Sequence, residues 1–93
     1  MKTYINNIEN GVQIRTDDED MSVYNALVEY LKKHPAVIIL RESITFETPI
    51  TDCKYQSIPF SVLFDEMADE TFVFVGREYD YRIIEKLVIA AVT

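Results

Sequence analysis

The chain has 93 residues, 48% of them hydrophobic, and its 16 acidic against 9 basic residues give a net charge of −7. This length and apolar content predict one folded domain and argue against a disordered chain. The acidic excess argues against direct binding to nucleic acid, which depends on Lys and Arg neutralising phosphates, and two glycines are too few for a Gly-rich phosphate-binding loop.

Cys53 is the only cysteine, so the chain can form neither an intramolecular disulfide nor a zinc site built on thiolates. No segment contains the roughly 20 apolar residues of a membrane span, and residues 1–7 are too polar for the core of a signal peptide. We therefore expect a cytoplasmic protein that contacts no membrane and carries no metal or cofactor.

Residues 3–16 are predicted to form a β-hairpin around Glu9, Asn10 and Gly11. A two-residue Asn10–Gly11 turn would leave neither face of the hairpin apolar. A three-residue loop, with Gly11 in the left-handed position of a bulge, would instead gather the apolar side chains on one face. These side chains are Tyr4, Ile8, Val12 and Ile14. Because a shift of one residue turns every side chain to the other face, we expect the longer loop.

An amphipathic helix is predicted over residues 20–34, and Pro35 ends it. Acidic residues at its start and Lys32, Lys33 and His34 at its end complement the helix dipole. Its apolar stripe consists of Val23, Ala26, Leu27, Tyr30 and Leu31.

The middle of the chain is predicted to form strands. Residues 36–40 are apolar on both sides, as in an interior strand. Arg41–Glu42 is expected to turn the chain into a further strand over residues 43–47, which Pro49 ends or interrupts. Residues 50–57 alternate poorly, so an edge strand and an ordered loop both remain open.

Pro59 and the spacing of Phe60, Leu63, Phe64 and Met67 predict a second helix over residues 59–68. Residues 71–75 form a second apolar strand, and residues 80–92 form a third helix, with a terminal strand as the alternative because many of them are β-branched. The predicted order is ββαββ(β)αβα. We expect an α+β fold, with a mainly antiparallel sheet of four to five strands and two to three helices packed on one face.

No pattern of residues indicates catalysis. His34 is the single histidine and serves a helix end, and Cys53 lies beside Asp52 rather than beside cations that would lower its pKa. No serine has the flanking glycines of a nucleophile elbow. We expect a protein that is not an enzyme.

The most distinctive polar stretch is residues 76–82, where Arg and Tyr are concentrated between a strand and a helix. Tyr and Arg are enriched at interface hot spots, although the same residues could form a local cap. Together with the acidic clusters, this stretch supplies the predicted contacts with a partner. They are Asp17, Asp18, Glu19, Asp20, Asp65, Glu66, Asp69, Glu70, Arg77, Tyr79, Tyr81 and Arg82.

The first hypothesis is a non-catalytic protein–protein interaction module, of the kind used as a small acidic inhibitor or immunity protein by phages and mobile elements. It would cover a basic surface on an enzyme that handles nucleic acid. The second is a small-ligand binder or minor enzyme with a pocket near Cys53 and Arg77. The third is a homo-oligomeric assembly component, such as a homodimer, joined through an unpaired strand edge within residues 43–56.

Overall fold

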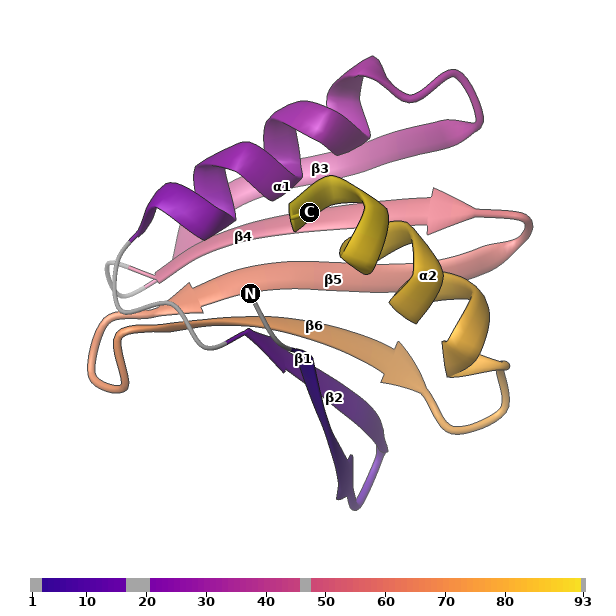
Figure 1. The fold of residues 1–93 in the computed structure, drawn as a ribbon, viewed down its shortest axis with the longest axis horizontal. Coiled ribbons are helices and arrows are strands. Elements are labelled where there is room, and N and C mark those ends of the chain that lie inside the picture. Colours follow the sequence, from indigo (N-terminus) through magenta and orange to yellow (C-terminus); the bar gives the residue numbers. More distant parts are fainter. Residues whose placement is uncertain (1–2, 17–20, 46–47, 93) are drawn as a thin grey trace.

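A computed structural model describes residues 3–16, 21–45 and 48–92. These residues form six strands and two helices in the order ββαββββα (Figure 1). The elements are β1 (Thr3–Ile8), β2 (Gly11–Thr16), α1 (Met21–Lys33), β3 (Val37–Thr45), β4 (Thr48–Tyr55), β5 (Ile58–Asp65), β6 (Glu70–Gly76) and α2 (Tyr81–Val92). The strands make one antiparallel sheet in the order β1-β2-β6-β5-β4-β3. The predicted α+β class is confirmed, with six strands in place of four to five.

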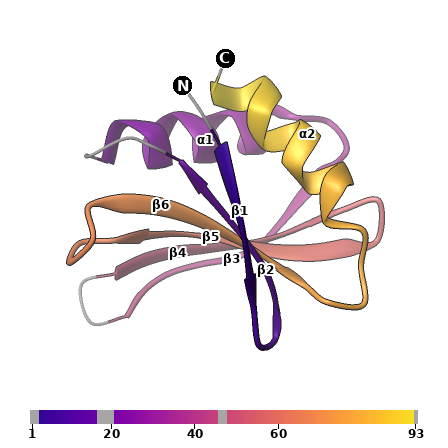
Figure 2. The ribbon, with the colours of Figure 1, turned by 60° about the horizontal axis from the view of Figure 1, so that its bottom comes forward.

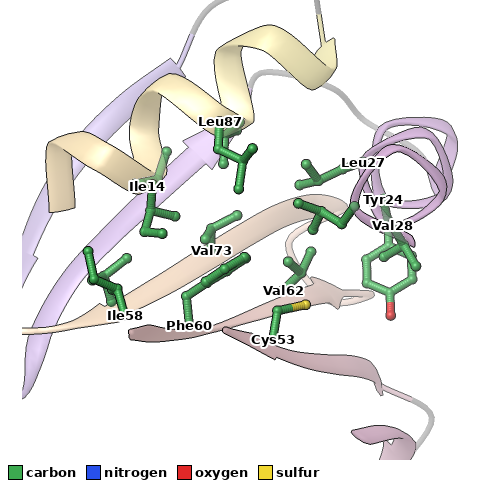
Figure 3. Packing of buried hydrophobic residues seen from close by; sticks show 14 of the residues in the cluster. Ile14, Tyr24, Leu27, Val28, Cys53, Ile58, Phe60, Val62, Val73 and Leu87 are labelled. Atoms are coloured by element: carbon green, nitrogen blue, oxygen red, sulfur yellow. The ribbon is translucent and has the colours of Figure 1, made fainter. Parts of the chain in front are cut away.

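The hydrophobic core lies between the two helices and one face of the sheet (Figure 3). Strand β5 shows how the sequence builds it, because its residues alternate between buried and more exposed. Its core side chains are Ile58, Phe60, Val62 and Phe64. Leu27 and Leu31 of α1 and Ile84 and Val88 of α2 meet this face and are fully buried.

The hairpin of β1 and β2 has a different register from the predicted one. Its turn contains only two residues, Glu9 and Asn10, because Ile8 pairs with Gly11. Val12 and Ile14 therefore face the core with Ile5, whereas Tyr4 and Ile8 lie on the opposite side of the sheet. The expected grouping of all four was wrong because β1 is an edge strand that need not carry a continuous apolar face.

Strand β3 is one continuous edge strand rather than an interior strand, a turn and a second strand. Arg41 and Glu42 continue the pairing with β4, and an irregularity between Ile39 and Arg41 absorbs the break in alternation. The third hypothesis placed a free edge within residues 43–56. Among the described residues of that range, 43–45 belong to the edge strand β3, whereas β4 pairs on both sides.

The predicted helix over residues 59–68 is wrong, because residues 58–65 form β5. A tight turn at Gln56 and Ser57 joins β4 to β5, and both residues have positive φ angles of 51° and 66°. This hairpin makes residues 50–55 an interior strand and pairs Pro59 with Lys54 near the strand's start.

The remaining elements agree with the sequence analysis in type and position. The buried side of α1 differs from the predicted stripe, because Tyr24 and Val28 are buried whereas Ala26 is exposed. Helix α1, strand β6 and helix α2 lie within one residue of the ranges expected for them, and Tyr81–Val92 is helical rather than a terminal strand. Neither helix in the described part of the chain has the length and apolar character needed to cross a membrane.

Candidate functional site

Both helices lie on the same side of the sheet, and no described helix covers the other side (Figure 2). We call this second side the open face. The strand register assigns to it every second residue of each strand, and these residues line up across the sheet in transverse rows. Along the strands, these rows change from acidic at one end, through apolar and polar, to a shallow hollow at the other end.

The apolar row contains Phe72, Leu63 and Ile50, which are adjacent because Leu63 pairs with both of the others. Leu63 and Ile50 are half-buried, whereas Phe72 is only 8% exposed. The guanidinium of Arg15 lies 5.8 Å from the centre of the Phe72 ring and covers it. Arg15 also donates hydrogen bonds to both carboxylate oxygens of Glu70 and is thereby held over the ring.

The next row on the open face, two residues further along each strand, is polar. The Ser61 hydroxyl donates a 2.6 Å hydrogen bond to the Asp52 carboxylate, which lies 3.3 Å from the Arg41 guanidinium. Ser61 and Asp52 are direct partners in the sheet, as are Asp52 and Arg41. The single histidine, His34, lies with Tyr30 and Tyr55 on the helix side, so Ser61 has no imidazole that could act as its base.

The third row contains a hollow, because Gly11 and Gly76 pair directly and place no side chains on the open face. A shallow cavity of about 370 Å³ lies beside Gly76. Leu40, Pro59 and Phe74 supply its apolar lining, and the Asp52–Ser61 pair supplies its polar lining.

An acidic turn between β5 and β6 borders the apolar row. Asp65 and Glu70 pair in the sheet directly beyond Leu63 and Phe72. The Asp65 carboxylate accepts hydrogen bonds from the backbone N–H groups of Met67 at 2.9 Å and Ala68 at 3.4 Å, which fixes the shape of the turn. Met67 is 99% exposed at the tip.

The predicted partner-binding residues fall into separate places. Asp65, Glu66, Asp69 and Glu70 come together in the acidic turn. Arg77, Tyr79, Tyr81 and Arg82 lie beyond the other end of β6, about 20 Å away at the usual rise per strand residue. Asp17–Asp20 lie outside the described residues.

Several residues of the Tyr and Arg group (residues 77–82) make contacts within the chain itself. Arg77 donates a 2.7 Å hydrogen bond to the backbone oxygen of Ile8 in the neighbouring hairpin. Tyr79 and Tyr81 are half-buried against the core, and Asp80 accepts a hydrogen bond from the backbone N–H of Arg82 at the start of α2. This is the local cap that the sequence left open as the alternative to a binding site.

Cys53 lies in the core on the helix side (Figure 3). Burial, with a smaller contribution from Asp52, raises the pKa of its thiol to about 12. The thiol is therefore protonated at neutral pH and does not act as a nucleophile. Cys53 contributes to the cavity beside Gly76, and Arg77 is not among the residues that line that cavity.

The described residues contain no group of three or more His, Cys, Asp or Glu side chains that could hold a metal ion. Comparison of the chain with protein-family models, curated proteins and solved structures finds no match.

Sequence reasoning missed the open-face residues Leu63, Phe72 and Arg15. The helical spacing predicts Leu63 on a helix, and the apolar run of residues 71–75 predicts Phe72 in a strand buried on both sides. The alternation of residues 58–65 was the available signal, since apolar side chains at 58, 60, 62 and 64 indicate one buried face of a strand. The contact between Arg15 and Glu70 joins residues 55 positions apart and had no local signal.

Proposed function

We propose that the protein is a non-catalytic protein–protein interaction module that binds a basic partner through its open face. The observation that carries this proposal is the apolar row beside the acidic turn, on a side of the sheet that no described helix covers. Antiparallel sheets can leave one face to solvent, but that face then usually carries alternating polar residues. Leu63 and Ile50 interrupt that pattern.

The apolar row and the polar groups around it are arranged as in a protein–protein interface, where apolar residues lie at the centre and polar residues at the rim. Leu63 and Ile50 would be covered by the partner, while the Arg15–Glu70 pair above Phe72 and the polar row would form its border. The contacts on this face between Ser61 and Asp52, and between Arg15 and Glu70, fix the surface in advance, which lowers the entropic cost of binding.

The acidic turn supports a basic partner. It holds four carboxylates in six residues, and of these four only Glu70 forms an ion pair with a described residue. Together with the net charge of −7, this favours fast association with a positively charged surface. Enzymes that handle nucleic acid present such surfaces, so we propose a small acidic inhibitor or immunity-type protein that covers one of them, as in phages and mobile elements.

The test is affinity capture with the tagged protein at increasing salt, using two double variants with equal change in net charge. Glu66→Lys/Asp69→Lys alters the acidic turn, and Glu78→Lys/Glu85→Lys alters the opposite end of the molecule. We expect the first variant to lose a basic protein that the wild type and the second variant retain at low salt. Equal loss from both variants, or retention by both, would contradict an interface at the acidic turn.

A second candidate function is self-association through β3, as in the homo-oligomer hypothesis. This edge strand exposes Ile38, Leu40 and Ile44 at 58%, 55% and 75%, and exposed apolar edge strands pair readily with other strands. The two candidates respond oppositely to salt, because salt screens the repulsion between two acidic copies but weakens binding to a basic partner. Light scattering that shows a monomer at both low and high salt would remove this second candidate.

A further inference from the structure

We propose that the groove between α1, α2 and the β4–β5 turn is a binding site for a small aromatic carboxylate. The groove lies on the helix side of the sheet and shares no residue with the open face. In Figure 1 the two helices diverge toward the β4–β5 turn. The residues that line the groove come from both helices, from the end of β4 and from this turn. It is therefore independent of the partner-binding proposal.

The groove has the dimensions of a small-ligand site. Its volume is about 370 Å³, within the range of roughly 300–1,000 Å³ usual for such sites. Helix α2 contributes an apolar wall, because positions three and four apart share one side of a helix. The wall consists of Ile83, Leu87 and Ala90.

Aromatic rings line the other side of the groove. The ring of His34 lies 5.9 Å from that of Tyr30 and 5.4 Å from that of Tyr55, with the second contact edge-on at 84°. These three side chains come from the end of α1 and the end of β4, and all line the groove. Edge-on and tilted rings offer both faces and edges to a flat ligand, which favours an aromatic body over a branched aliphatic one.

Each polar group of the lining can donate a hydrogen bond, and the Lys86 ammonium can only donate. The Nδ1 atom of His34 accepts a 3.1 Å hydrogen bond from the backbone N–H of Ala36, so the neutral imidazole carries its proton on Nε2. Lys86 has no anionic partner among the described residues, and the side-chain amide of Gln56 and the hydroxyls of Tyr30 and Tyr55 have no hydrogen-bond partner there.

No Asp or Glu lines the groove, although acids outnumber bases in the chain as a whole. A site with one ammonium group, several donors and no carboxylate favours an anion over a cation or a neutral ligand. The aromatic lining and the size restrict that anion to a flat molecule with about one ring. An aromatic carboxylate combines both features.

The test is a titration of the isotope-labelled full chain, followed by NMR, with benzoate as the probe and benzamide and benzylamine as neutral and cationic controls. We expect saturable shifts for Tyr30, His34, Tyr55 and Lys86 with benzoate, and binding about tenfold or more weaker with either control. Lys86→Gln should weaken benzoate binding by about fivefold to tenfold, whereas Lys54→Gln on the open face should leave it unchanged.

The inference would be overturned by an absence of saturable shifts at the groove, by equal binding of benzamide, or by shifts that map to the open face. Lys86 is exposed, so its replacement by Gln keeps the fold, and circular dichroism verifies this. Failure here leaves the partner-binding proposal intact, because the capture experiment tests the acidic turn, which lies at the other end of β5 from the β4–β5 turn.

Discussion

The two glycines of the chain face each other in β2 and β6, and the space around them differs. A Cβ atom on Gly11 would collide with the backbone oxygen of Val75, which cannot move without breaking the sheet. A Cβ atom on Gly76 would meet only the Glu78 carboxylate, with its oxygens at 3.1 and 3.2 Å, and that side chain can rotate away.

We therefore predict that Gly11→Ala lowers the free energy of unfolding by about 1–3 kcal/mol, as overpacking does. Gly76→Ala should cost less than about 1 kcal/mol, as substitutions with room to relax do. Urea unfolding of both variants beside the wild type measures the two costs. Equal costs would show that the close approach of β2 and β6 at Gly11 is not a constraint.

Cys53 gives a prediction for alkaline pH. Its thiol has a pKa of about 12 in the folded chain, against an ordinary value of 9.0. Below pH 9 the thiol is protonated in both states; above it, the unfolded chain loses the proton first. Stability therefore falls as pH rises from 9 toward 12, by up to about 1.4 kcal/mol per pH unit from this group.

Cys53→Ala removes this contribution and should flatten the fall in stability above pH 9. Burial also raises the pKa of Tyr24, which adds to the alkaline loss in both proteins, and the smaller part of that rise due to the charge of Cys53 disappears with the thiol and belongs to the predicted difference. Urea unfolding at about pH 8 and about pH 10.5 gives the two slopes. Identical slopes for the variant and the wild type would contradict a thiol held protonated by the core.

At the scale of elements, the sequence predicts those whose period is unambiguous. The apolar stripe of α1 and the run of residues 71–75 identify a helix and a strand correctly. Residues 58–65 fit two periods, since Phe60, Leu63, Phe64 and Met67 have helical spacing while every second residue from Ile58 is also apolar. Only the turn at Gln56–Ser57 decides between them, and it lacks the Asn-Gly pair that marks such turns.

The open face was harder to predict than the core. Its apolar row exists because the register places Phe72, Leu63 and Ile50 side by side from three strands. The register between strands that are distant in the sequence depends on the fold as a whole, so it cannot be predicted from a short stretch of sequence. The acidic turn was found because its carboxylates are adjacent in the sequence.

The β4–β5 turn itself is testable. Ser57 has a φ angle of 66°, in the left-handed region where a side chain costs roughly 1–2 kcal/mol. Ser57→Gly should therefore stabilise the protein by about 0.5–1 kcal/mol. The same substitution in α1, Ser22→Gly, should destabilise it by a similar amount, because glycine disfavours a helix. Thermal unfolding measures both, and a loss of stability in Ser57→Gly would contradict the turn geometry.

At the scale of the whole molecule, the sheet separates two surfaces with different chemistry. The helix side holds the core and a donor-rich groove, while the open face holds the apolar row and the acidic turn. One edge of the sheet is formed by the short β1 and the other by the nine-residue β3 with its exposed aliphatic side chains. A partner on the open face would leave the groove accessible.

The most direct measurement of the central proposal is partner affinity for two variants that place the same residue on opposite sides of the molecule. Leu63→Arg puts a cation into the apolar row, and Ile89→Arg puts one on α2, where Ile89 is 39% exposed. We predict that Leu63→Arg weakens binding of the captured basic protein by about a hundredfold, equivalent to about 2.7 kcal/mol, while Ile89→Arg binds like the wild type. Unchanged binding by Leu63→Arg, or equal loss in both variants with the fold intact, would contradict an interface on the open face.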